Sequence, residues 1–118
     1  MANLNVDVSE FTINGGRIAH IPEFGGRMVT IAYARNYEQG TVEYGATIYQ
    51  PGDDAWVRKD ANQLATLRAT QYPVSIPDND EWTGRERKEA VRQAMYLNGA
   101  SSNPSATRIG TLLWRASQ

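Results

Sequence analysis

The chain has 118 residues and a mass of 13.1 kDa, which fits one domain, residues 1–118, with one modest core. Its formal net charge of -1 lacks the positive excess that sequence-independent binding to nucleic acid polymers requires. The absence of cysteine excludes disulfides, thiolate metal sites and cysteine nucleophiles. No apolar run is long enough for a membrane span and no signal peptide is recognisable, so we expect a cytoplasmic protein that does not bind membranes.

The first predicted element is a short hairpin near the N-terminus. Asn14-Gly15-Gly16 separates residues 11–13 from residues 17–19, and Asn-Gly supplies the positive φ angles that a tight hairpin turn needs. Pro22 and the Gly25-Gly26 pair then interrupt the chain. The next strand is therefore expected to begin at about Arg27.

Residues 28–49 carry the clearest strand pattern. Side chains of residues 28–34 alternate between two faces, and residues 41–49 are again rich in Thr, Val, Tyr and Ile. The polar residues 36–40 connect the two runs. This pattern predicts an antiparallel hairpin.

A helix is predicted at residues 55–70. The preceding Pro51-Gly52-Asp53-Asp54 is typical of a turn, and either aspartate can cap the helix because its carboxylate accepts free backbone N–H groups. The residues predicted to face the core recur at helical spacing: Val57, Ala61, Leu64 and Leu67 or Arg68.

The remaining elements are shorter or less regular. Pro73 and Pro77 bracket a short extended segment, and a second helix is expected from residues 80–83 to Asn98-Gly99. Thr83 and Glu86 have capping-box spacing, and the charged residues 81–89 are interpreted as a solvated face. Residues 107–115 can close the fold as a last strand. The predicted class is α+β, a small antiparallel sheet with two helices.

No catalytic or metal-binding pattern is recognisable in the sequence. His20 is the only histidine and has no nucleophile motif beside it, which favours a structural role. The pairs Asp53-Asp54 and Asp78/Asp80/Glu81 lack calcium-loop spacing and lie where helix caps are expected. The glycines form no phosphate-binding loop. We therefore expect no enzymatic activity, no bound metal and no cofactor.

Binding of a small anion has more support from the sequence. The planar guanidinium of arginine forms paired hydrogen bonds with phosphate, and aromatic rings can stack on a nucleobase. For every arginine and aromatic residue considered, the alternative to ligand binding is a place in the core, in a subunit interface or on the solvated surface. The candidate ligand-binding residues are Arg35, Trp56, Arg58, Asn62, Arg68, Tyr72, Arg108 and Arg115.

The order of segments in residues 28–73 resembles a phage family. VTIAYARN is followed by a turn, by TVEYGATIYQP, by an Asp-containing loop and by RKDANQLATLRATQYP. This order is similar to that of the small phage proteins that defeat the bacterial Thoeris defence by sequestering its cyclic ADP-ribose signal. The resemblance implies a homo-oligomer, built from an antiparallel sheet and helices, that holds a nucleotide between subunits in the host cytoplasm without turning it over.

Two other classes of function stay open at the level of sequence. A phage structural protein or a protein-binding inhibitor of a host factor would fit the alternating strands and the nearly neutral charge equally well. An enzyme is the third class, and an activity that survives both His20→Ala and the removal of divalent metal would favour it.

Overall fold

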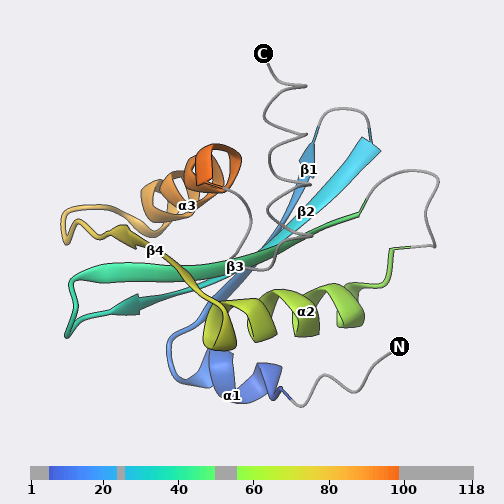
Figure 1. Ribbon diagram of the computed structural model, residues 1–118, viewed down its shortest axis with the longest axis horizontal. Helices are drawn as coiled ribbons and strands as arrows, with labels where there is room; N and C mark the ends of the chain where they lie inside the picture. The colour runs from blue at the N-terminus through green and yellow to red at the C-terminus, as the bar shows by residue number, and fades with distance from the viewer. Residues whose placement is uncertain (1–5, 24–25, 50–55, 99–118) are drawn as a thin grey trace.

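The described part of the chain folds into an antiparallel four-stranded sheet with helices on both faces (Figure 1). The computed structural model describes residues 6–23, 26–49 and 56–98. The strands lie side by side in chain order: β1 (Arg17–Glu23), β2 (Arg27–Asn36), β3 (Thr41–Tyr49) and β4 (Val74–Pro77). One face of the sheet packs against α1 (Val8–Ile13) and α2 (Arg58–Gln71), and the other against α3 (Gly84–Asn98). The predicted α+β class is confirmed.

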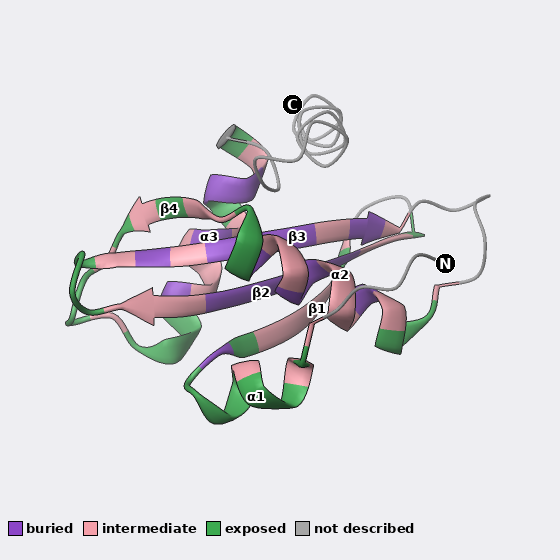
Figure 2. Cartoon of the chain, turned by 60° about the horizontal axis from the view of Figure 1, so that its bottom comes forward, coloured by how far each residue is buried: buried purple, intermediate pink, exposed green. Residues whose placement is uncertain are grey.

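The central hairpin formed by β2 and β3 is confirmed. The two strands pair along their whole length, with Val29 opposite Ile48 and Ile31 opposite Ala46. These positions are buried because successive side chains of a strand point to opposite faces, and each face here carries a helix. Figure 2 shows the resulting burial along the inner strands.

The larger hydrophobic core lies between the sheet and α3. Tyr44 and Ile31 of the inner strands are fully buried there, together with Val91 and Met95 of α3. Val91 and Met95 are four residues apart and therefore lie on the same side of the helix. α3 begins with the predicted capping box, since Glu86 N donates to Thr83 Oγ1 at 3.1 Å and Thr83 N donates to Glu86 Oε1 at 2.9 Å.

The helix α2 packs on the sheet through small side chains. Its buried residues include Ala61, Ala65 and Ala69, which repeat every four positions. Ala65 and Ala69 pack with Ala32 of β2, and Ala69 lies against Gly45 of β3. The prediction that Val57 and Leu64 face the core is wrong, because Val57 is exposed and Leu64 is only half-buried. A large side chain would hold the helix away from the sheet, whereas alanine opposite glycine lets the backbones approach.

The bounds of α2 and β4 agree closely with the predictions. α2 begins at Arg58, and its N-cap Val57 makes no side-chain capping hydrogen bond. Asp53 and Asp54, the predicted caps, lie outside the described residues, as do Gly99 and the predicted strand at residues 107–115. Among the described residues, no helix is long and apolar enough to cross a membrane.

The predicted N-terminal hairpin is wrong, because its first arm is the helix α1. Asp7 caps this helix, accepting a hydrogen bond from Glu10 N at 3.0 Å. Gly15 does adopt a positive φ of 98°, but it leads the chain out of α1 and into β1. The side chain of Phe11 then packs against the small core beneath α2, which an extended arm beside β1 would not allow. β1 pairs with β2 instead.

Candidate functional site

A basic cavity opens where β1 begins, β2 ends and α3 begins. Its volume is ≈ 660 Å³, which lies between the ≈ 720 Å³ and ≈ 560 Å³ of two other cavities of the molecule. Five of its lining side chains are cationic and two are aromatic, and none is acidic. The lining residues are Gly15, Arg17, Tyr33, Ala34, Arg35, Tyr37, Gly84, Arg85, Arg87 and Lys88.

Tyr33 forms the buried wall of this basic cavity. It lies opposite Arg17 in the pairing of β1 with β2, on the face of the sheet that carries α3. Burial raises the pKa of the Tyr33 phenol, and the charges of Arg17 and Arg87 act in the opposite direction because both lie near it. At neutral pH the phenol keeps its proton and can donate a hydrogen bond into the cavity.

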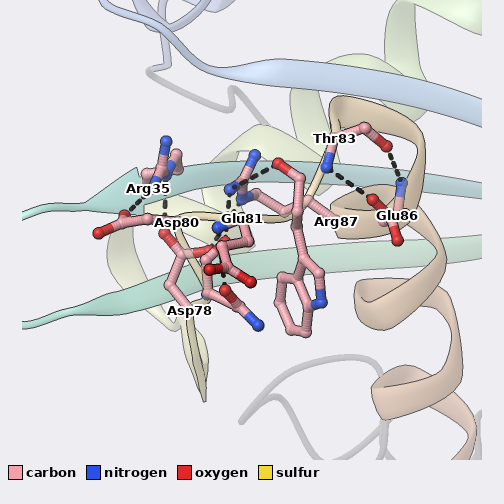
Figure 3. A network of polar contacts seen from close by, with 9 residues as sticks. Arg35, Asp78, Asp80, Glu81, Thr83, Glu86 and Arg87 are labelled. Carbon is pink, nitrogen blue, oxygen red and sulfur yellow. Dashed lines mark hydrogen bonds and ion pairs between the residues drawn. The ribbon is translucent and has the colours of Figure 1, made fainter.

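Two arginines of the cavity are held in place by one carboxylate, Asp78 (Figure 3). Arg35 donates from Nε to Asp78 Oδ2 at 2.7 Å, and Arg87 donates from Nε to Asp78 Oδ1 at 2.9 Å. Arg87 also donates to the carbonyl of Asn79 at 3.0 Å. Burial alone would raise the pKa of Asp78, but the hydrogen bonds from Arg87 and Arg35 outweigh it and hold this pKa below its ordinary value.

Arg35 has a second, more accessible partner in Asp80. The Asp80 side chain is 93% exposed, whereas that of Asp78 is 7% exposed, so only the Asp78 pair is shielded from water. The Arg35 guanidinium also lies 4.6 Å from the centre of the Tyr37 ring, in a cation–π contact. Arg35 is thus orientated by β2, by the chain before α3 and by an aromatic ring at the cavity's rim.

The other three cations of the cavity are not neutralised. Among the described residues, Arg17, Arg85 and Lys88 have no carboxylate within ion-pair distance. Arg85 and Lys88 belong to the first turns of α3, where the helix dipole adds positive potential. Cationic side chains converging from β1 and α3, in a cavity whose described lining includes no carboxylate, provide a site for a group that carries more than one negative charge.

Only one of the predicted ligand-binding residues, Arg35, lines the basic cavity. Arg58 and Asn62 line a different cavity of ≈ 720 Å³, between the start of α1 and the start of α2. Beside that cavity the ring of Trp56 meets the ring of His20 edge to face, with centroids 5.4 Å apart. These residues therefore do not form one site with Arg35, because they lie on the α2 face of the sheet.

The contacts of His20, next to α2, indicate a structural role. Its Nδ1 is 3.0 Å from Thr30 Oγ1 on the neighbouring strand. Burial and then the charge of Arg58 lower the pKa of His20, while a hydrogen-bonding interaction with the Asn62 side chain acts in the opposite direction. The imidazole is neutral at pH 7 and joins β1 to β2.

The remaining predicted residues are dispersed. Arg68 donates from Nη1 to the carbonyl of Ala46 at 2.7 Å. Ala46 lies in the part of β3 that does not pair with β4, since that pairing ends at Tyr44. Burial lowers the pKa of the Arg68 guanidinium. Tyr72 is half-exposed at the end of α2. Arg108 and Arg115 lie outside the described residues.

The sequence did not single out most of the basic cavity. The charged residues 81–89 were interpreted as a solvated face, and this is wrong for Arg87, which is buried. A signal for this site was present in the sequence, the Arg85-x-Arg87-Lys88 run that follows the capping residue Thr83 and Gly84. The run places cations at a helix N-terminus, where the helix dipole does not favour them, and so indicates a role other than helix stability. Arg17 and Tyr33 could be joined to this run only through the strand pairing.

Among the described residues, no three or more His, Asp or Glu side chains are grouped so that they could hold a metal ion. Comparison of the chain with protein-family models, with curated proteins and with solved structures identified no match.

Proposed function

We propose that the basic cavity binds a nucleotide through its phosphate groups and that the chain sequesters this nucleotide without changing it. The observation that carries the proposal is the composition of the cavity wall, in which five cations meet two tyrosines and no carboxylate. Arg17, Arg85 and Lys88 form no ion pair with a described carboxylate, so their side chains can reorient toward a ligand. Phosphate oxygens are the acceptors that such guanidinium and ammonium groups bind best.

The size and the rim of the cavity are consistent with a whole nucleotide. Its volume of ≈ 660 Å³ falls within the range of about 300–1,000 Å³ that is usual for small-molecule sites. Tyr37 is exposed at the rim, and its ring can stack on a nucleobase while the phosphates lie deeper, near Arg17 and Lys88. Within this class, the family resemblance narrows the proposed ligand to a cyclic or ADP-ribose-like nucleotide.

Sequestration rather than turnover is supported by the groups that surround the ligand. The described residues of the cavity wall include no carboxylate, imidazole or thiol, the side chains that most often act as general bases or nucleophiles. Sequestration of a signalling nucleotide against a host anti-phage defence, by a homo-oligomer in the host cytoplasm, is the role that the family resemblance implies.

The proposal is tested by calorimetric titration with cyclic ADP-ribose isomers, ADP-ribose and cyclic dinucleotides. At least one of them should bind the unaltered chain and be recovered chemically unchanged. Arg85→Ala and Lys88→Ala should each weaken that binding by about 10- to 100-fold, the value of a charge-assisted hydrogen bond of about 1.5–3 kcal/mol. Arg85 is exposed and Lys88 half-buried on α3, and neither forms an ion pair with a described residue, so the melting temperature should change little.

Arg58→Ala is the matched control, because it removes an arginine that lines the separate cavity beside α1. Binding should be unaffected by this change. Failure of every nucleotide to bind at millimolar concentration, or an equal loss of affinity in the Arg58→Ala variant, would contradict the proposal.

A second candidate function, binding of a protein partner, is favoured by exposed apolar side chains. Ile13 at the end of α1 is 82% exposed and Leu97 near the end of α3 is 69% exposed. Single exposed apolar residues are common on proteins, so their exposure alone does not indicate an interface. The test is whether these two side chains contribute to the binding of a partner protein. Ile13→Ser and Leu97→Ser should then lower the mass of the complex with that partner, measured by light scattering, and leave nucleotide binding unaltered.

A further inference from the structure

A second polar cavity, of opposite character, lies on the α2 face of the sheet. Its volume is ≈ 560 Å³, and its wall is formed by α1, α2 and the inner strands. In Figure 2 the two helices lie on the near side of the sheet. Its acidic lining residues are Asp7, Glu10 and Glu43, and the described lining residues include no lysine or arginine.

Thr66 of α2 is an unsatisfied polar residue in this acidic cavity. The whole residue is 0% exposed, and its Oγ1 makes no hydrogen bond with any described group. A buried hydroxyl without a partner is rare, because it loses its hydrogen bonds to water and gains none in return. The backbone carbonyl of Thr66 does accept a hydrogen bond, from Thr70 Oγ1 at 2.9 Å. The group that lacks a hydrogen-bond partner is therefore the side-chain hydroxyl of Thr66, a residue that lines the cavity.

Glu43 is the second residue without a partner. Because side chains alternate along β2 and β3, Glu43 lies on the α2 side of the sheet, and it is the only charged residue on that side of these two strands. Its neighbours there are small, namely Ala34 opposite it and Gly45 two positions on. It is half-buried and forms no ion pair with a described residue. A half-buried carboxylate in this position calls for a cation.

We propose that this acidic cavity binds a small aliphatic diamine. One ammonium group donates to the carboxylate of Glu43 and to Thr66 Oγ1, and the alkyl chain lies along Phe11, Ala34 and Ala69. The second ammonium group is held near the start of α1 by Asp7 and Glu10. Asp7 Oδ1 already accepts the capping bond from Glu10 N, which leaves its other oxygen for the ligand.

The placement of the acids on separate elements favours an extended organic dication over a metal ion. The described carboxylates of the cavity come from β3 and from the start of α1, and they are not grouped as the ligands of one metal. A hard metal ion needs several oxygens around one centre, whereas a diamine places its two charges at opposite ends of a chain. The inference does not depend on nucleotide binding, because the basic cavity involves β1 and α3 instead.

The test is calorimetric titration of the full chain with 1,4-diaminobutane at low ionic strength, with Mg²⁺ as the comparison. The unaltered chain should bind the diamine and show no comparable heat with Mg²⁺. Glu43→Gln should weaken diamine binding by at least tenfold, and Thr66→Val, which keeps the shape of the side chain, should weaken it by about threefold, as expected for one lost hydrogen bond of modest strength.

Glu38→Gln is the matched control, since Glu38 is exposed in the connection between β2 and β3 and does not line the cavity. It should leave the affinity unchanged, and so should Arg85→Ala in the basic cavity. If Glu43→Gln does not fold, as judged by circular dichroism, Glu10→Gln on the exposed end of the site takes its place. Absence of diamine binding, equal binding of Mg²⁺, or an equal effect of Glu38→Gln would overturn the proposal.

Discussion

The backbone nitrogen of Ala69 in α2 lies only 2.3 Å from the position that a Cβ atom on Gly45 of β3 would take. No side chain fits between the helix and the strand at this point. Gly45→Ala should therefore force α2 away from the sheet and lower the free energy of unfolding by about 1–3 kcal/mol, as is usual for an overpacked core. Urea denaturation followed by circular dichroism measures the change.

Gly84→Ala is the control for Gly45→Ala. A Cβ at Gly84, the first residue of α3, would meet no atom within 4 Å. It should leave the free energy of unfolding unchanged or raise it slightly, because alanine is the better helix former. If both variants were equally stable, α2 would not be packed against Gly45 as described.

The Asp78 carboxylate is expected to be the main electrostatic support of the chain before α3. Asp78→Asn would leave Arg87, a buried cation, with neutral oxygen acceptors only, the new amide and two backbone carbonyls. We expect the free energy of unfolding to fall by about 3 kcal/mol, because breaking a buried ion pair leaves an uncompensated charge. Asp80→Asn, which alters the exposed partner, should change it by about 0–1 kcal/mol. Similar effects of the two substitutions would contradict this account.

The contribution of Asp78 should also depend on pH in a defined direction. Its pKa is lower in the folded protein than in the unfolded chain, where it is about 3.9, so the folded state favours the ionised form. The stabilisation is then fully present above about pH 4–5 and is lost as the pH falls through the lower, folded pKa. The stability difference between the unaltered chain and Asp78→Asn should be constant from pH 7 to 5 and shrink below pH 4. Measuring both proteins removes the contributions of other carboxylates.

Asp80 should compete with a bound nucleotide for Arg35. The exposed carboxylate of Asp80 pairs with Arg35 Nη2 at the rim of the basic cavity, and its negative charge opposes that of a phosphate bound deeper in the cavity. If the proposed function is correct, Asp80→Asn should raise nucleotide affinity by about two- to tenfold, because it removes a negative charge and a competing acceptor worth about 1 kcal/mol. Titration at two salt concentrations checks this, and weaker binding by the variant would show that Asp80 orientates Arg35 for the ligand instead.

The capping box at α3 gives a simpler stability prediction. Thr83→Ala removes the acceptor of Glu86 N and should lower the free energy of unfolding by about 1 kcal/mol. Thr83→Ser keeps that acceptor and should restore most of the loss. Because α3 also presents Arg85 and Lys88 to the basic cavity, nucleotide affinity should fall in Thr83→Ala and recover in Thr83→Ser.

Local patterns in the sequence predicted the elements whose stability is local. The alternation in residues 28–34, the prolines at 73 and 77 and the Thr83/Glu86 pair each correspond to observed structure. The N-terminal hairpin failed because Asn14-Gly15 suits two outcomes, a hairpin turn or the end of a helix. The contact of Phe11 with the core, which is remote in sequence, decided between them.

The candidate sites were beyond the reach of the sequence for the same reason. Arg35 could be noticed as a cation after a strand, but its neighbours Arg17 and Lys88 are brought to it by strand pairing and by the packing of α3. The sequence by itself determined the α+β class and the central hairpin, since a periodic pattern of burial is written in consecutive residues. Only the tertiary structure decided which charges share a cavity, because electrostatic potential depends on distance in space and not on separation along the chain.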